Sequence, residues 1–290
     1  MQYDMPLYRP PSEARSLIVQ VALGCSHNRC SFCSMYQQKR FRPRPPEEVR
    51  RDIVEAARTM GPDVPRVFLA DGDAMCLSPR RLSQILGWLN EHLPGLERVG
   101  VYANARDVLR KTPEELRALR QQKLGILYMG LESGDDVTLE NICKGATADE
   151  IVRAVRKAQD AGFTVSVMVL IGLAGQERSL IHARASAEAV TRMAPAYTAL
   201  LTYTPVAGSP LFERIRAGDV TLPDPEESLA EIRAFVAGLG DFETYFTCNH
   251  ASNYLPLRGH LPGARQGLLE ALDAALDGKI ALKPEFLRGL

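Results

Sequence analysis

The chain has 290 residues and a mass of 32.0 kDa, and 46% of its residues are hydrophobic and 24% charged. This composition excludes a disordered or collagen-like protein, and the length suffices for one large domain or two modest ones. Lysine plus arginine equals aspartate plus glutamate at 35 each, so the overall charge indicates neither nucleic acid nor an anionic membrane as a partner.

Signals for membranes or secretion are absent from the sequence pattern. The longest apolar stretch, 163–175, is interrupted by Thr164 and Ser166 and is well short of the ~20 residues that a membrane helix needs. Residues 1–15 contain charges and prolines but no apolar segment typical of a secretory signal. We therefore expect a cytoplasmic protein that does not cross a membrane.

Apolar runs of strand length alternate with amphipathic segments of helix length along most of the chain. The runs are almost continuously hydrophobic, which is typical of parallel strands covered on both faces. Strands are expected at 17–23, 66–70, 98–103, 126–131, 164–171 and 197–203. Helices are expected at about 47–60, 79–92, 113–122, 147–161 and 177–193. Thr112 and Thr147, each followed by acidic residues, are typical helix-capping residues.

Six repeated strand–helix units predict one parallel sheet with right-handed crossovers. Six is short of the eight units of a closed barrel, which leaves a partial barrel or an open doubly wound sheet. After residue 218 the rhythm breaks, and a helix at 225–238, a polar loop and a helix at 264–277 follow. We predict an α/β fold, a partial (β/α)6 TIM-like barrel over 1–218, with a C-terminal helical cap over 219–290 in the same compact domain.

Three of the six cysteines lie close together directly after the first predicted strand, with the spacing Cys-x4-Cys-x2-Cys at Cys25, Cys30 and Cys33. Loops that leave the carboxyl ends of parallel strands line the active face of such folds. In a reducing compartment this crowding indicates metal ligation and not a disulfide framework. Three thiolates can hold three corners of a cubane iron–sulfur cluster and leave one iron open to an external molecule.

A zinc site is the alternative for the same loop, because His27 lies between the first two cysteines and would complete a Cys3His tetrahedron. Ligands packed within nine residues suit a cluster better than a zinc site, whose ligands usually form two separated pairs. The remaining cysteines, Cys76, Cys143 and Cys248, are too scattered to indicate a second cluster.

The segment 24–33, Gly-Cys-Ser-His-Asn-Arg-Cys-Ser-Phe-Cys, resembles the cluster loop of the radical S-adenosylmethionine (SAM) superfamily, including the aromatic Phe32 before the last cysteine. The resemblance implies a [4Fe-4S] cluster whose open iron binds the amino and carboxylate groups of SAM. Reduction then splits SAM into methionine and a 5′-deoxyadenosyl radical. The family's usual spacing is Cys-x3-Cys-x2-Cys, so this chain carries one extra residue between Cys25 and Cys30 while keeping the ligand count.

Further motifs follow the strands in the family's order. Asp71-Gly72-Asp73 stands where the family has Gly-Gly-Glu, which implies contact with the SAM amino group, although a plain turn is the alternative. Gly130-Leu-Glu-Ser-Gly and Lys144-Gly-Ala-Thr are similar to segments of the oxygen-independent coproporphyrinogen oxidase, methylthiotransferase and Elongator-like branches. This likeness implies Glu132 near the ribose hydroxyls of SAM and Lys144 at the methionyl carboxylate, with Ser133 among the cofactor-binding residues. A helix-capping Glu132 and a solvated Lys144 are the alternatives.

Two glycines at the end of the fifth predicted strand, Gly172 and Gly175, resemble the family's Gly-Leu-Pro-Gly-Glu turn. They would let the backbone pass close to a flat ligand such as adenine. Met168 holds a place where one branch keeps an aspartate for the ribose, so that contact is expected to be missing or supplied elsewhere. With a final motif at 203–211, the resemblance spans roughly residues 17–215.

Substrate contacts are expected from the C-terminal region, where residues 246–259 gather polar and aromatic side chains in a predicted loop. Four of these are expected to face a ligand: Asn249, His250, Asn253 and Arg258. The alternative is a loop whose side chains bind its own backbone. Arg42, in the basic run 37–44, is a candidate contact for an anionic substrate, or part of a solvated face. Cys143 is a candidate hydrogen-atom donor, or a small core residue.

These observations predict a radical SAM enzyme that abstracts a hydrogen from an unidentified substrate, with a small molecule favoured. A reductant such as flavodoxin or ferredoxin is the expected protein partner. The alternatives are a non-enzymatic iron–sulfur carrier or sensor, and then a zinc-bound interaction module.

Overall fold

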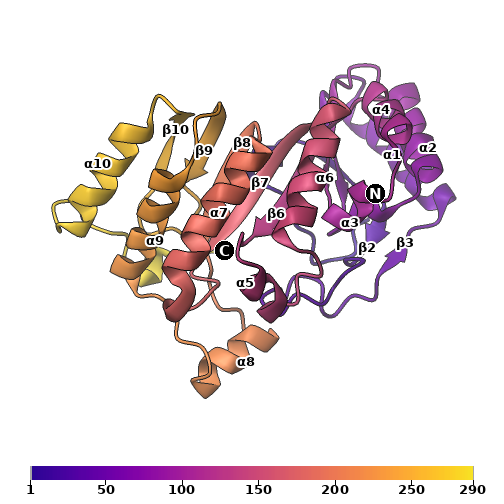
Figure 1. The fold of residues 1–290 in the computed structure, drawn as a ribbon. Helices are drawn as coiled ribbons and strands as arrows, with labels where there is room; N and C mark the ends of the chain where they lie inside the picture. The colour runs from indigo at the N-terminus through magenta and orange to yellow at the C-terminus, as the bar shows by residue number, and fades with distance from the viewer. Residues whose placement is uncertain (1, 290) are drawn as a thin grey trace. The chain divides into compact units, whose positions relative to one another are not determined.

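The computed structural model describes residues 2–289 as an α/β fold with a mostly parallel sheet of eight strands (Figure 1). The strands follow the order β1-β4-β5-β6-β7-β8-β9-β10. The six predicted strands are all present, at β1 Leu17–Gln20, β4 Arg66–Ala70, β5 Arg98–Tyr102, β6 Leu124–Glu132, β7 Thr164–Ile171 and β8 Tyr197–Thr202. The predicted fold class is therefore confirmed.

The first predicted strand is shorter than expected. β1 ends at Gln20, and the next segment, β2 (Ala22–Leu23), pairs instead with β3 (Arg42–Pro43) in a separate two-stranded antiparallel sheet. Apolar residues run through both segments, so the hydrophobic pattern alone does not reveal the change of partner.

The predicted helices are present with ends that agree to within two residues. They are α1 Pro46–Met60, α2 Pro79–His92, α4 Pro113–Gln121, α6 Ala148–Asp160, α7 Ser179–Met193, α9 Pro225–Gly238 and α10 Arg265–Leu276. Thr112 forms a capping box with Glu115, and the Thr147 hydroxyl and the Glu150 carboxylate exchange the same two bonds with backbone N–H groups. Both bind N–H groups that the first helical turn leaves unpaired.

Three short helices lie outside the prediction: α3 Ala105–Leu109, α5 Asp136–Asn141 and α8 Pro210–Ala217. The predicted loop at 246–259 is also wrong at both ends. β9 (Thr244–Cys248) and β10 (Leu257–Leu261) form an antiparallel pair, and β9 runs parallel to β8. The C-terminal region thus adds strands as well as helices. Alternate residues of β9 are buried, as expected for a strand that packs one face against the core.

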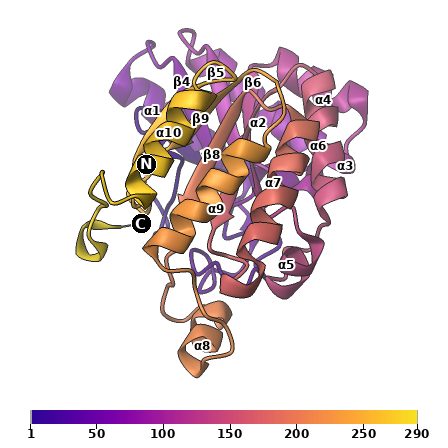
Figure 2. The same cartoon turned by 60° about the vertical axis from the view of Figure 1, so that its left-hand side comes forward.

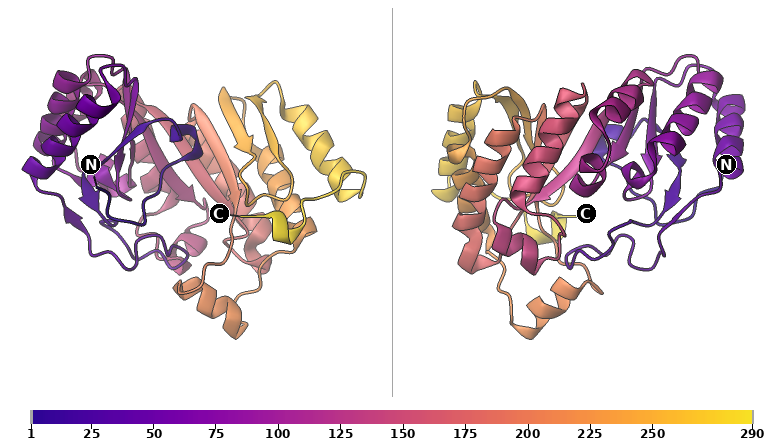
Figure 3. Two further views of the ribbon diagram at one scale, coloured as in Figure 1. Left: turned by 180° about the vertical axis from the view of Figure 1, so that it is seen from behind. Right: turned by 45° about the vertical axis from the view of Figure 1, so that its right-hand side comes forward.

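The chain divides into two compact units. The first contains the N-terminal segment through Asn28, Met35–Met129 and Ala154–Val165. In it α1, α2 and α4 pack side by side (Figure 3). Phe68 and Tyr128 form a core cluster on one face of the sheet, and Leu7 of the N-terminal segment packs against it. The Tyr3 hydroxyl donates to the Ile18 carbonyl at 2.9 Å, which fastens this segment to β1.

The second unit contains Arg29–Ser34, Gly130–Arg153 and the chain from Ser166 onward. Its helices α7, α9 and α10 lie side by side (Figure 2). Strand register sets Met168, Ala199 and Thr247 next to one another on β7, β8 and β9. All three are half-buried, whereas the alternate residues Thr198 and Phe246 are fully buried.

Candidate functional site

The turn Asp71-Gly72-Asp73 follows β4 in the first unit, and its first carboxylate fastens the cysteine loop. Asp71 is fully buried. Its Oδ2 accepts a hydrogen bond from the backbone N–H of Gly24 at 3.0 Å and another from Gln20 Nε2 at 3.1 Å. Gly24 directly precedes Cys25, so the Asp71 carboxylate fixes the backbone where the loop begins.

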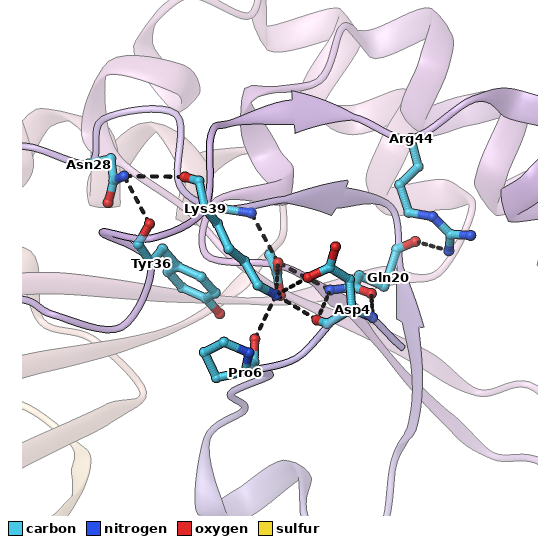
Figure 4. A network of polar contacts seen from close by, with 9 residues as sticks. Asp4, Pro6, Gln20, Asn28, Tyr36, Lys39 and Arg44 are labelled. Atoms are coloured by element: carbon cyan, nitrogen blue, oxygen red, sulfur yellow. Dashed lines mark hydrogen bonds and ion pairs between the residues drawn. The ribbon is translucent and has the colours of Figure 1, made fainter. Parts of the chain in front are cut away.

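Lys39 supplies the positive charge beside this carboxylate (Figure 4). Its Nζ lies 3.3 Å from Asp71 Oδ2 and 3.2 Å from Asp4 Oδ1, and donates to the Pro6 carbonyl at 2.7 Å. Burial raises the pKa of Asp71, while the hydrogen bond from Gly24 and the charge of Lys39 act in the opposite direction. The network joins the N-terminal segment, the end of β4 and the chain after the cysteine loop.

The basic run 37–44 therefore has no single role. Lys39 is buried in the network just described, and Arg44 donates to Asp52 at 2.6 Å and to the Gln20 carbonyl at 2.9 Å. Arg42, on β3, is exposed to solvent. It is the predicted substrate contact within this segment.

Gly72 brings the turn against the first cysteine. A Cβ atom on Gly72 would lie 2.5 Å from the Tyr36 ring and 3.2 Å from the Cβ of Cys25. The Gly72 N–H also donates to the Gly24 carbonyl at 3.2 Å. Only glycine allows this approach, because a side chain would displace the ring or the turn.

Asp73, the second carboxylate of the turn, is fully buried. Its Oδ2 accepts hydrogen bonds from the Ser26 hydroxyl and from Asn104 Nδ2, the latter at 2.7 Å. Arg106 Nη2 donates to Ser26 Oγ at 2.6 Å. Burial, and after it the neighbouring Asp107 carboxylate, raises the pKa of Asp73 to about 7.

Among residues 2–289, the Oδ1 atoms of both Asp71 and Asp73 are buried without a hydrogen-bond partner. Buried carboxylate oxygens are normally paired, because leaving one unpaired forfeits its hydration without a replacement. Two such oxygens in one turn fit a ligand that brings N–H donors or a positive charge.

Asn104 and Arg106 were not predicted as site residues. They follow β5, the next parallel strand after β4, and carboxyl ends of parallel strands meet at one edge of a sheet. Polar residues in Asn104-Ala-Arg106-Asp107 directly after a hydrophobic strand were the signal available in the sequence.

In the second unit, Glu132 and Lys144 form an ion pair at the end of β6. Lys144 Nζ lies 2.9 Å from Glu132 Oε1, and both side chains are largely buried. Glu132 has a φ of 61°, a left-handed conformation that is uncommon outside glycine. A Cβ on Gly130 would meet Glu132 Oε1 at 1.8 Å, so the carboxylate folds back over a position that must be glycine.

Two turns in the second unit contain Ser133, Gly172 and Gly175, and buried side chains of neighbouring helices contact both turns. Ser133 is fully buried, and its hydroxyl contacts His182 Nδ1 at 2.7 Å. Gly172 and Gly175 have φ values of 81° and 72°, which favours glycine at both. The Gly172 N–H donates to Glu231 Oε1 at 2.8 Å.

The three clustered cysteines are all half-buried. The loop around Cys30 and Cys33 is anchored by backbone bonds at Ser31, whose N–H donates to the Ile142 carbonyl at 2.9 Å and whose carbonyl accepts from Leu211 at 2.8 Å. Three thiols on one anchored loop are the donor set that a cubane cluster needs. Within residues 2–289, no three histidine, cysteine or carboxylate side chains are grouped to hold a single metal ion; a cubane instead offers each thiolate its own iron.

One predicted substrate contact is wrong. Asn253 is fully buried, and its Oδ1 accepts from the Thr202 N–H at 2.8 Å and from the Thr202 hydroxyl at 2.9 Å, while its Nδ2 donates to the Leu200 carbonyl at 2.9 Å. The buried amide therefore fastens the loop to β8, and Asn253 is not a ligand contact.

The other predicted contacts differ in exposure. His250 binds its own loop, because its Nδ1 accepts from the Ser252 N–H at 3.2 Å. Burial, and then the charge of Lys283, lowers the pKa of His250. Asn249 and Arg258 are exposed, and Phe32 is half-buried. Cys143 is exposed with a φ of 55°, so the alternative that it is a core residue is wrong.

Comparison of this sequence with models of known protein families shows which family the chain belongs to. Residues 19–183 match the family model of the Radical SAM superfamily. The chain belongs to the radical SAM superfamily. Members of this superfamily are enzymes that use a [4Fe-4S] cluster and SAM, which confirms the predicted family and cofactors.

Two curated relatives cover most of the chain. A bovine protein, "Radical S-adenosyl methionine domain-containing protein 1, mitochondrial", is 27% identical over 243 residues, which are 78% of this chain and 52% of that protein. "Heme chaperone HemW" of Bacillus subtilis is 23% identical over 221 residues, which are 73% of this chain and 56% of that protein. The radical SAM chain thus spans about half the length of the curated relatives it matches.

Solved structures show the same fold. Coproporphyrinogen III oxidase (HemN) from Escherichia coli matches with a TM-score of 0.57 and 16% identity, over 77% of this chain and 51% of that chain. The archaeal Elongator protein of Methanocaldococcus infernus matches with a TM-score of 0.53 and 14% identity, over 91% and 63%. No helix in the described part of this radical SAM protein is long and apolar enough to cross a membrane.

Proposed function

We propose that this chain cleaves SAM reductively at a cluster held by Cys25, Cys30 and Cys33, and abstracts a hydrogen atom from a small organic substrate. The observation that carries the proposal is the turn after β4, which holds two buried carboxylate oxygens without hydrogen-bond partners and whose Gly72 lies against the first of the three cysteines. When bound, the cluster supplies the electron that breaks SAM into methionine and a 5′-deoxyadenosyl radical.

In this proposal the turn after β4 receives the amino group of SAM. An ammonium group brings three N–H donors and one positive charge, and Asp71 and Asp73 offer the buried oxygens that lack donors. The surroundings of Asp73 are more negative than those of Asp71, because the Asp107 carboxylate lies beside Asp73. Without a ligand, a proton on Asp73 neutralises part of this negative charge. A bound ammonium group would neutralise it instead.

The turns after β6 and β7 carry the residues proposed for the ribose, the carboxylate and the adenine of SAM. A carboxylate at Glu132 accepts hydrogen bonds from two vicinal ribose hydroxyls, and Lys144 neutralises the methionyl carboxylate. Gly172 and Gly175 keep the turn after β7 free of side chains, which suits close passage of a flat adenine ring. Asn249, Arg258 and Arg42 remain candidate substrate contacts, since all three are exposed. A flavodoxin or ferredoxin would supply the electron.

The test is anaerobic reconstitution with iron and sulfide, followed by dithionite and SAM, with 5′-deoxyadenosine measured by chromatography. The wild type should bind about four irons per chain and release 5′-deoxyadenosine. Cys30→Ala should lose both the iron and the product. Cys248→Ala is the matched control, because Cys248 is a buried cysteine of β9 outside the loop, and it should retain both.

Two outcomes would reject the proposal. A wild-type cluster that takes up electrons but leaves SAM intact would support an electron carrier or sensor. A protein that binds one colourless tetrahedral metal in place of iron would support a zinc module.

A second candidate function is haem binding, which the likeness to the protein named Heme chaperone HemW favours. Titration of the reconstituted chain with haem, followed by absorbance, tests it. A saturable spectral change at one haem per chain would support this candidate, and a spectrum equal to that of free haem would reject it.

A further inference from the structure

A buried polar network in the second unit connects the turn after β6 with the turn after β7. Its members come from two helices that pack side by side, α7 and α9. His182, Ser186 and Ser179 project from α7 and Glu231 from α9, and all four are buried. Glu231 lies beyond the segment 19–183 that matches the family model.

At the turn after β6, the network holds Ser133 and Gly134. His182 Nδ1 lies 2.7 Å from Ser133 Oγ, and Ser186 Oγ accepts from the Gly134 N–H at 2.8 Å. A Cβ on Gly134 would lie 2.2 Å from the Ala185 carbonyl oxygen. The turn is therefore pressed against α7 and cannot shift without moving these bonds.

At the turn after β7, the network holds Gly172. Glu231 Oε1 accepts from the Gly172 N–H at 2.8 Å, and Glu231 Oε2 accepts from the Ser179 hydroxyl. His182 Nε2 lies 3.4 Å from Glu231 Oε1, a contact without hydrogen-bond geometry, and within residues 2–289 this nitrogen has no hydrogen-bond partner. The Glu231 carboxylate thus bonds to the turn after β7 and lies beside the His182 imidazole, which contacts the turn after β6.

Burying ionisable groups between two helices costs desolvation free energy. Burial raises the pKa of Glu231 to about 7 and lowers the pKa of His182 to about 4. Apolar side chains of similar size would fill the same space without this desolvation cost. The polar groups add directional contacts, because His182, Ser186 and Glu231 each contact a hydroxyl or a backbone N–H of a turn.

We propose that Glu231 and His182 are positioning residues that hold the Glu132–Ser133 turn and the Gly172 turn in one register for SAM. The inference rests on the proposed function, in which Glu132 contacts the ribose and Gly172 the adenine. These two parts of SAM are joined by one covalent bond, so the turns that receive them must be spaced to match. A helix of the C-terminal region would then set the affinity of the family's core for its cofactor.

The experiment compares Glu231→Ala and Glu231→Gln with the control Glu226→Gln, which changes an exposed glutamate on the same helix. Hydrogen exchange by mass spectrometry on the protein without SAM follows peptides that contain residues 131–135 and 170–176. The dissociation constant for SAM is measured on the reconstituted proteins, together with iron content and thermal stability.

Glu231→Ala should speed exchange in both peptides and raise the SAM dissociation constant about tenfold, the cost of one hydrogen bond to a charged group. Iron content should stay at the wild-type level. Glu231→Gln keeps an amide oxygen for the Gly172 N–H and should recover most of the affinity. Glu226→Gln should match the wild type in every measurement.

The outcomes separate this inference from the proposed function. Unchanged exchange in both peptides of Glu231→Ala would overturn the positioning role, and so would faster exchange with SAM affinity within twofold of the wild type. If the wild type itself does not bind SAM, the proposed function fails. Exchange in Glu231→Ala then still decides whether the network holds the two turns.

Discussion

The turns after β4 and β6 both place buried carboxylates at a strand end, but they treat the charge differently. In the first unit Asp73 is only loosely paired with a cation, since Arg106 Nη2 lies 3.9 Å from its Oδ2, and the Asp107 carboxylate lies nearby. In the second unit Glu132 is matched by Lys144 at 2.9 Å. Asp73 is therefore less closely matched by positive charge than Glu132, although Asp71 in the same turn is paired with Lys39.

This difference separates two ways of binding one ligand. A carboxylate without a partner gains a charge-assisted hydrogen bond when a cation arrives, and it loses nothing in exchange. A paired carboxylate and ammonium must give up part of their contact with each other before they contact a ligand. We therefore expect the turn after β4 to contribute more affinity for SAM than the turn after β6.

The largest expected effect tests Asp71, the carboxylate of the first turn that is closely paired with a cation. Lys39→Met leaves Asp71 buried without its partner and should lower the free energy of unfolding by about 3 to 5 kcal/mol. The loss should be smaller at low pH, where Asp71 is protonated. Urea denaturation measures the change. Arg40→Met is the control, an exposed neighbour that should stay within about 0.5 kcal/mol of the wild type; an equal loss in both variants would contradict the assignment.

The next effect tests the unpartnered oxygen. Asp73→Asn keeps acceptor and donor atoms for Ser26 and Asn104 but removes the charge, so the SAM dissociation constant should rise about a hundredfold. Anaerobic equilibrium dialysis with labelled SAM measures it. Iron content should remain normal, because Asp73 is not bonded to the backbone of the cysteine loop.

Asp71→Asn is the matched comparison within the same turn. Asp71 holds the Gly24 N–H beside Cys25, so this variant should lose iron as well as SAM affinity. If Asp71→Asn and Asp73→Asn behave alike in both measurements, the division of labour between the two carboxylates is wrong.

A smaller effect is expected in the second unit. Lys144→Met should raise the SAM dissociation constant about tenfold, because the variant loses one ion pair with the ligand but no longer has to break the pair with Glu132. The double variant Glu132→Gln/Lys144→Met should cost less than the sum of the two single variants, as expected for side chains in contact. Strict additivity would show that the ion pair does not oppose binding.

The fold was largely predictable because its strands are buried on both faces. β4 and β7 agree with the predicted ranges residue for residue, since turn signals end their apolar runs clearly. β9 and β10 were missed because several polar residues lie in the segment 249–256 between them, and because Arg258 and His260 interrupt the apolar pattern of β10. Alternation with one half-exposed face is a weaker signal than a continuous apolar run.

The candidate site was predictable only where a motif marks it. Asp71, Asp73, Glu132 and Lys144 were found because they lie in recognisable turns, and the structure adds which of them are paired. Asn253 was misread, since its amide contacts β8, which lies some fifty residues earlier in the chain. Glu231 was missed for the same reason, because nothing near it in the sequence indicates a bond to Gly172.

The smallest expected effect concerns the pH dependence of folding. The pKa of Glu231 is raised by burial from 4.5 to about 7. Its contribution to stability is therefore complete below pH 4.5 and is lost as the pH rises through about 7. Between pH 6 and pH 7 the wild type should lose about 1 kcal/mol relative to Glu231→Gln, which cannot ionise. Urea unfolding of both proteins across this range measures the difference, and Glu226→Gln should keep the wild-type slope. A constant difference between wild type and Glu231→Gln would mean that the carboxylate is ionised throughout and that its bonds to Gly172 and Ser179 compensate its burial.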